Sequence, residues 1–158
     1  MTTFDFNDGN GPVPAHQHAN GGGWVADTAT VDKTAYVGPY ARVFGSAMVS
    51  DNARVSGNAE VYGNAQVYGN AMVSGYAWVY DNAKVSGKAK VSGNAEVYGN
   101  AMVSGYAKVS GEVTGSTASE IEDNKEPKVR VEKIAHIEIE DGHYDAVIIN
   151  GVKYVKET

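Results

Sequence analysis

The sequence predicts an all-β parallel solenoid, a fold in which short strands stack coil upon coil. Valine occurs at position 25 and at every sixth position after it through Val109, which gives 15 consecutive occurrences. Alanine follows four residues after each of these valines from Ala29 through Ala107. Neither the period of a helix nor the alternation of an isolated strand explains a strict period of six. A stacked solenoid explains it, because each repeat covers its neighbour with the same two apolar residues.

The repeat unit, read at residues 55–60 as Val-Ser-Gly-Asn-Ala-Glu, resembles the hexapeptide repeat of left-handed parallel β-helices. This resemblance implies that three hexads form one triangular coil of 18 residues, with the valines pointing inward. Fifteen hexads then make about five coils. Gly and Asn between the short strands suit tight corners, because both tolerate a positive φ.

The breaks in the period divide the chain into four parts. Residues 1–22 are rich in Gly and Pro and predict an irregular N-terminal arm or cap, followed by the repeat at residues 23–113. Residues 114–128 are polar, acidic and interrupted by proline, which is typical of a linker. Residues 129–158 alternate apolar and polar positions, and Asp141-Gly142 and Asn150-Gly151 predict hairpin turns. We expect a three-stranded meander there, near residues 129–140, 144–149 and 152–156, that serves in docking or oligomerisation.

Composition excludes several classes of function. The formal net charge is −6 and no basic run occurs, which argues against binding to nucleic acid or to an anionic membrane. There is no long apolar stretch, no N-terminal segment with the pattern of a signal peptide, and no cysteine. We therefore expect a cytoplasmic protein without thiolate chemistry, located in the host cell if a phage encodes it.

An 18-residue coil makes residues i and i+18 neighbours, so outward side chains form columns. One column is aromatic and contains Phe44, Tyr62, Tyr80 and Tyr98; another contains Arg42, Glu60, Trp78 and Glu96. Aromatic neighbours on a pleated surface can be simple packing. The alternative is a binding face or a contact with a second copy, because exposed tyrosines suit interfaces. The resemblance implies a homotrimer of prisms packed side by side.

Two histidines, His16 and His18, alternate in the N-terminal arm, so an extended backbone would place both rings on one side. A metal site needs at least one further ligand, and none is evident nearby. We expect no metal site and assign these residues to a surface or packing role, with a site shared between subunits as the alternative.

Catalysis is not expected, although many proteins of the hexapeptide family are acyltransferases and some are zinc enzymes. Residues 24–110 contain no histidine that could act as a general base and no inserted loop that could wall a pocket. No catalytic residue and no cofactor is therefore assigned, and an acyltransferase remains the enzymatic alternative.

The preferred hypothesis is a non-enzymatic oligomer that binds a small anionic ligand of the nucleotide type in clefts between subunits. Residues 149–155 look like the terminal segments of phage proteins, so the ligand could be a host defence signal that the protein sequesters. A structural scaffold or virion component is the alternative. The candidate ligand-binding residues are Arg42, Arg54, Tyr62, Trp78, Tyr80, Tyr98, His16 and His18.

Overall fold

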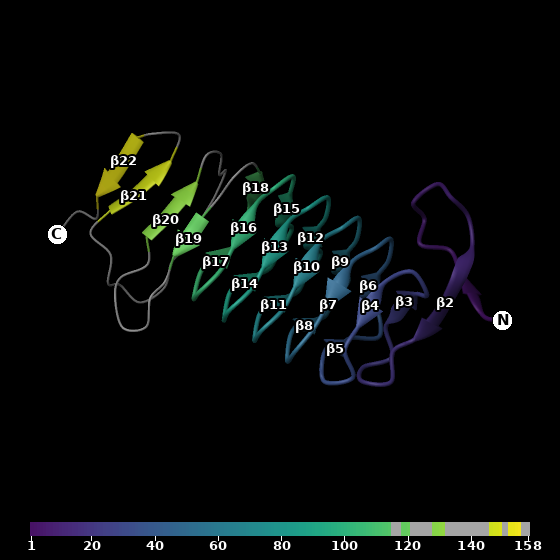
Figure 1. Ribbon diagram of the computed structural model, residues 1–158. Coiled ribbons are helices and arrows are strands. Elements are labelled where there is room, and N and C mark those ends of the chain that lie inside the picture. Colours follow the sequence, from purple (N-terminus) through teal and green to yellow (C-terminus); the bar gives the residue numbers. More distant parts are fainter. Residues whose placement is uncertain (115–117, 121–127, 132–145, 150–151, 156–158) are drawn as a thin grey trace.

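The computed structural model describes residues 1–114, 118–120, 128–131, 146–149 and 152–155. The described chain is built from strands and turns, and it contains no helix that could cross a membrane. Its central part is a parallel β-solenoid of about five coils, which confirms the predicted fold class (Figure 1).

Three parallel sheets form the sides of the solenoid, and the chain visits each sheet once per coil. The first sheet contains β3 (Trp24–Ala26), β6 (Arg42–Val43), β9 (Glu60–Val61), β12 (Trp78–Val79), β15 (Glu96–Tyr98) and β18 (Glu112–Thr114). The second contains β4 (Thr30–Val31), β7 (Met48–Val49), β10 (Gln66–Val67), β13 (Lys84–Val85) and β16 (Met102–Val103). The third contains β5 (Tyr36–Val37), β8 (Arg54–Val55), β11 (Met72–Val73), β14 (Lys90–Val91) and β17 (Lys108–Val109).

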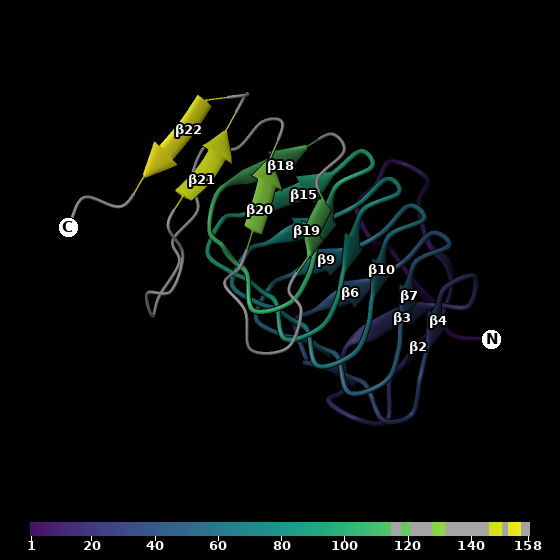
Figure 2. The ribbon, with the colours of Figure 1, turned by 60° about the vertical axis from the view of Figure 1, so that its left-hand side comes forward.

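The register of the strands confirms the 18-residue coil. Trp78 pairs with Glu60 on one side and Glu96 on the other, and Val79 pairs with Val61 and Val97 in the same way. Backbone N–H groups at regular places in the repeat donate to the next coil, as Tyr62 N does to Val79 O at 3.0 Å. Figure 2 shows the resulting coils stacked along one axis.

The core is a stack of valines and alanines. Every repeat valine from Val37 to Val97 is fully buried, and so is every repeat alanine from Ala35 to Ala101. Full burial of one valine side chain is worth about 1.5–3 kcal/mol. In each short strand the valine follows an outward residue, and successive residues of a strand point to opposite sides. Each strand therefore directs one valine into the interior of the solenoid.

The corners use the left-handed backbone that the Gly-Asn pattern predicts. Gly75 has a φ of 73°, and Asp81 occupies the equivalent corner place with a φ of 56°. Asp81 is tolerated there because its Oδ2 accepts a hydrogen bond from Gly99 N, in the next coil, at 3.2 Å.

The N-terminal segment is more regular than the irregular arm that its composition predicts. β1 (Thr3–Phe4) and β2 (Val13–Gln17) pair antiparallel, and β2 pairs antiparallel with β3, so the first sheet continues past the solenoid. Phe6 is buried against Phe44, with ring centroids 4.8 Å apart. Residues 1–22 therefore cover the end of the solenoid as a hairpin (Figure 1).

The C-terminal part forms a four-stranded sheet, in the order β19 (Ala118–Glu120), β20 (Lys128–Val131), β21 (Ala146–Ile149), β22 (Val152–Val155). The prediction of a three-stranded meander is wrong in two respects. β19 lies inside the expected linker, and β20 pairs parallel with β21, which a meander does not allow. Asp141-Gly142 and Asn150-Gly151, the two expected turns, lie outside the described residues.

Candidate functional site

The predicted ligand-binding residues do not form one site within the chain. Arg42 and Trp78 project from the first sheet. Tyr62 and Tyr80 lie just after its strands, and Tyr98 is the last residue of β15. Arg54 projects from the third sheet. His16 and His18 belong to the N-terminal segment. The strands place these residues on different sides of the solenoid, so each has to be judged by its own contacts.

The aromatic column is a packed stack rather than the exposed row that the sequence suggests. Phe44, Tyr62, Tyr80 and Tyr98 are stacked at 4.9, 4.9 and 5.0 Å between neighbouring ring centroids. Phe44 is buried and the three tyrosines are half-buried. These rings have their faces covered by each other, so the column offers mainly edges and hydroxyl groups to a ligand.

Electrostatics at the tyrosine hydroxyls oppose ionisation. Burial, and then the nearby carboxylates, raise the pKa of Tyr62 to about 12. The same causes, led by burial and followed by Glu96, raise the pKa of Tyr80 to about 12. At Tyr98 a hydrogen bond to the Glu112 carboxylate raises the pKa of the hydroxyl. These tyrosines are therefore proton donors at neutral pH.

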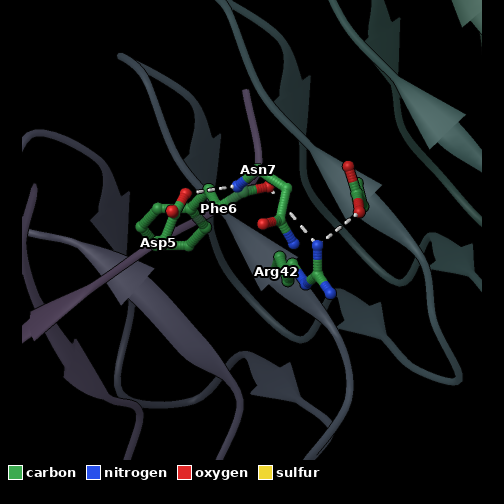
Figure 3. A network of polar contacts seen from close by, with 5 residues as sticks. Asp5, Phe6, Asn7 and Arg42 are labelled. Atoms are coloured by element: carbon green, nitrogen blue, oxygen red, sulfur yellow. Dashed lines mark hydrogen bonds and ion pairs between the residues drawn. The ribbon is translucent and has the colours of Figure 1, made fainter. Parts of the chain in front are cut away.

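Arg42 holds the N-terminal segment to the solenoid. Its Nη1 donates to Glu60 Oε1 at 3.2 Å and to the backbone oxygen of Phe6 at 3.4 Å (Figure 3). Burial raises the pKa of Glu60, and the positive charge of Arg42 opposes that shift. The predicted column that makes Arg42 and Glu60 neighbours is therefore confirmed.

The two histidines have different partners. His16 Nδ1 lies 2.8 Å from Asp27 Oδ1 at an exposed position. His18 is 7% exposed, and its Nε2 lies 3.0 Å from the backbone oxygen of Ala35. The described residues contain no group of three His, Cys, Asp or Glu side chains able to hold a metal ion. His18 therefore packs against the first coil, whereas His16 makes a polar contact with Asp27 at the surface.

The third sheet carries a hollow that the sequence analysis did not identify. Its volume is about 290 Å³, and it is lined by Met72, Ser74, Lys90, Ser92, Lys108, Val109 and Ser110. Lys90 stands between Met72 and Lys108 in the strand register. The serines follow the inward valines and form a parallel column beside the lysines.

Charge is distributed unequally over the three sheets. The outward positions of the third sheet are Tyr36, Arg54, Met72, Lys90 and Lys108, with three cations and no carboxylate. Those of the first sheet are Trp24, Arg42, Glu60, Trp78, Glu96 and Glu112, with three carboxylates and one cation. The second sheet presents one cation, Lys84. A chain of net charge −6 therefore concentrates positive charge on one face.

The signal for this face was present in the sequence. The residue before each repeat valine points outward, and those 18 residues apart share a face. Taking Tyr36 and every eighteenth residue after it gives the cationic column, which ends at Lys108. Arg54 is the one predicted site residue in that column, and it lies outside the hollow, with its guanidinium 4.5 Å from the centre of the Tyr36 ring. The aromatic column instead predicted the first sheet as the binding face, because exposed tyrosines are typical of interfaces.

Comparison with known families supports the repeat architecture. Residues 65–81 and 95–111 match the family model described as the YdcK beta solenoid repeat. Comparison with curated proteins and with solved structures gives no match. The matched segments and the stacked coils together show a β-helix repeat protein.

Proposed function

We propose that this protein is a non-enzymatic binding protein that holds a small anionic ligand on the third sheet. The observation that carries the proposal is the coincidence of the hollow with the cationic column. Lys90 and Lys108 both line the hollow, on a face whose outward strand positions contain no carboxylate. A ligand with phosphate or carboxylate groups would gain charge-assisted hydrogen bonds there.

The residue types in the hollow suit a ligand with both charged and apolar parts. The Lys90 ammonium group is a donor to anionic oxygens, and the hydroxyl groups of Ser74 and Ser92 are further donors. Met72 supplies a polarizable thioether that can contact a ring. Nucleotide-type molecules combine these features, so host defence signals of that class are the first ligands to test.

The solenoid would favour binding by holding these groups in place before the ligand arrives. Met72, Lys90 and Lys108 lie on three consecutive coils that are joined by strand pairing. Strand spacing puts neighbouring side chains about 4.8 Å apart along the axis. The backbone that carries these side chains does not have to rearrange when the ligand binds, which lowers the entropic cost of association.

Isothermal titration calorimetry tests this proposal with pyrophosphate, ATP and a panel of cyclic nucleotides as ligands. Lys90→Gln should weaken binding by tenfold or more, because a hydrogen bond to a charged group contributes about 1.5–3 kcal/mol. Lys84→Gln is the matched control, since Lys84 occupies the same strand position on the second sheet and has the same charge. Equal affinities of the two variants, or no heat with any ligand, would overturn the proposal.

A structural spacer is the second candidate function. The observation that favours it is the unbroken stack, because no insertion separates the repeats from Val25 to Val109. Such a spacer, for example in a virion, should copurify with a large partner or assemble further. A ligand-binding protein should remain a discrete particle, so size measurement of the purified protein separates the two functions.

A further inference from the structure

The first and third sheets are complementary at a fixed offset in the sequence. Four of the five outward residues of the third sheet have a matching residue on the first sheet six positions later. The fifth, Lys108, has its match four positions later, because Glu112 lies opposite Glu96 in the strand register. The pairs are Tyr36 with Arg42, Arg54 with Glu60, Met72 with Trp78, Lys90 with Glu96, and the last cation, Lys108, with the last carboxylate, Glu112.

The members of these pairs cannot satisfy each other within one copy. They project from different sheets on the two sides of a corner, as Lys90 on β14 and Glu96 on β15 do. In the described part of the chain, neither Arg54 with Glu60 nor Lys90 with Glu96 forms an ion pair. Within the chain Glu60 pairs with Arg42, Glu112 accepts a hydrogen bond from Tyr98, and Glu96 accepts one from the Tyr80 hydroxyl at 3.5 Å.

Solenoid geometry brings the same pairs together between copies. One coil climbs about 4.8 Å and visits three sheets, so each strand lies about 1.6 Å higher than the one before it. In a closed ring all copies stand at the same level with parallel axes. A third-sheet residue then lies about 1.6 Å along the axis from the neighbour's first-sheet residue that follows it by one hexad. The first-sheet residue on the coil below lies about 3.2 Å away, so the following residue is the one it faces.

We propose that copies of this chain associate side by side, with the first sheet of one copy docked on the third sheet of the next in this register. Arg54 meets Glu60, Lys90 meets Glu96, and Lys108 meets Glu112 across the interface. Met72 packs on Trp78, which is 42% exposed in the single chain. Tyr36 contacts the Arg42 guanidinium, an arrangement favoured by cation–π attraction.

In the alternative register, each third-sheet residue faces the first-sheet residue twelve positions before it, on the coil below. Charge disfavours that register. It would place Arg54 against Arg42 and would leave Lys108 with Glu96 as its one pair of opposite charges. The proposed register has three pairs of opposite charges and no pair of like charges, so charge favours it.

The corner between the third and first sheets supports the same docking. Tyr40 and Tyr76 lie at this corner and are 72% and 64% exposed. Flat contact between two sides of an equilateral prism turns each copy by about 60°, which closes a ring of about six copies with this corner inward. The two exposed tyrosines would then be covered near the ring axis. The homotrimer implied by family resemblance would require the sheets to meet at an angle.

The docking uses the same lysines as the proposed ligand site. A neighbour's carboxylates and an anionic ligand therefore compete for Lys90. Excess pyrophosphate should shift the oligomer towards smaller species, beyond the shift that sodium chloride produces at equal ionic strength.

Charge reversal followed by sedimentation velocity tests this inference on the full chain. Lys90→Glu and Glu96→Lys should each reduce the particle to smaller species, because each puts like charges together. The double variant should restore the wild-type size, since the reversed charges meet again across the interface. Lys84→Glu is the control and should leave the size unchanged, and circular dichroism checks that all variants remain folded.

The outcomes separate this inference from the proposed function. Glu96→Lys leaves the hollow intact, so anion binding should persist in a variant that no longer associates. A wild-type monomer or trimer, single reversals that keep the wild-type size, or a double variant that fails to recover would each overturn the inference. Loss of anion binding in Lys90→Gln alone would bear on the ligand site and not on the docking.

Discussion

Replacement of Gly75 by alanine tests how the corners of the solenoid stack. A Cβ at Gly75 would lie 2.7 Å from the oxygen and 2.9 Å from the nitrogen of Gly93, which are backbone atoms of the next coil. Gly93 has a similar φ, 67° against 73°, but a Cβ there would be 4.0 Å from the nearest atom, Ser110 O. The two glycines therefore share the backbone requirement and differ in the space above them.

The two effects can be separated by magnitude. A left-handed backbone costs an alanine about 1–2 kcal/mol at either position. Only Gly75→Ala adds a contact with backbone that must shift, and overpacking of this kind costs about 1–3 kcal/mol more. We expect the free energy of unfolding to fall by about 1–2 kcal/mol in Gly93→Ala and by about 2–5 kcal/mol in Gly75→Ala.

Urea denaturation followed by circular dichroism measures this difference, with the midpoints and slopes of both variants compared with wild type. Gly75→Asp should be milder than Gly75→Ala, because Asp81 shows that a carboxylate at this place accepts a hydrogen bond from the next coil. Equal losses in Gly75→Ala and Gly93→Ala would refute the reasoning, since they would mean that the coils are not in this close contact.

Three further predictions concern the core, the N-terminal segment and the tyrosine stack. Val67→Asp should abolish folding, because Val67 is fully buried and an unpaired charge would lie inside the solenoid; an unchanged thermal midpoint would disprove the inward orientation. Phe6→Ala removes a ring stacked on Phe44, so it should speed hydrogen exchange in β2 while the central coils stay protected. Because the pKa values of Tyr62 and Tyr80 are raised to about 12, their folded forms hold protons that the unfolded chain releases near pH 10. Stability should therefore fall from about pH 10 to about pH 12, less steeply in a variant with both tyrosines changed to phenylalanine.

The parts of the fold that depend on a strict period were predictable from the sequence. A spacing of 18 residues placed Tyr62 on Tyr80 and Arg42 beside Glu60, because stacked coils convert sequence distance directly into spatial distance. The inward position of valine, like the 18-residue length of the coil, was implied by the resemblance to hexapeptide repeats, and the burial of the valines confirms it. Neither conclusion needed information about tertiary packing beyond the repeat itself.

The remaining features depend on contacts that have no period. Nothing in the composition of residues 1–22 shows that Phe6 extends the aromatic stack, since that contact requires an antiparallel hairpin on β3. The parallel pairing of β20 with β21 was likewise hidden, because alternation identifies strands but not their partners. The hollow on the third sheet is a third such feature, because the interval of 18 gives the charge of a face but not the shape of its surface.

Amide chemical-shift mapping of the isotope-labelled protein during titration with pyrophosphate tests the central claim most directly. If the third sheet is the binding face, the largest shifts should occur at Ser74, Ser92 and Ser110, which line the hollow, and Lys90→Gln should reduce them. Amides of the second sheet around Gln66 and Lys84 should change little. Shifts centred on the tyrosine stack or the second sheet, or no shifts at saturating anion, would contradict the account.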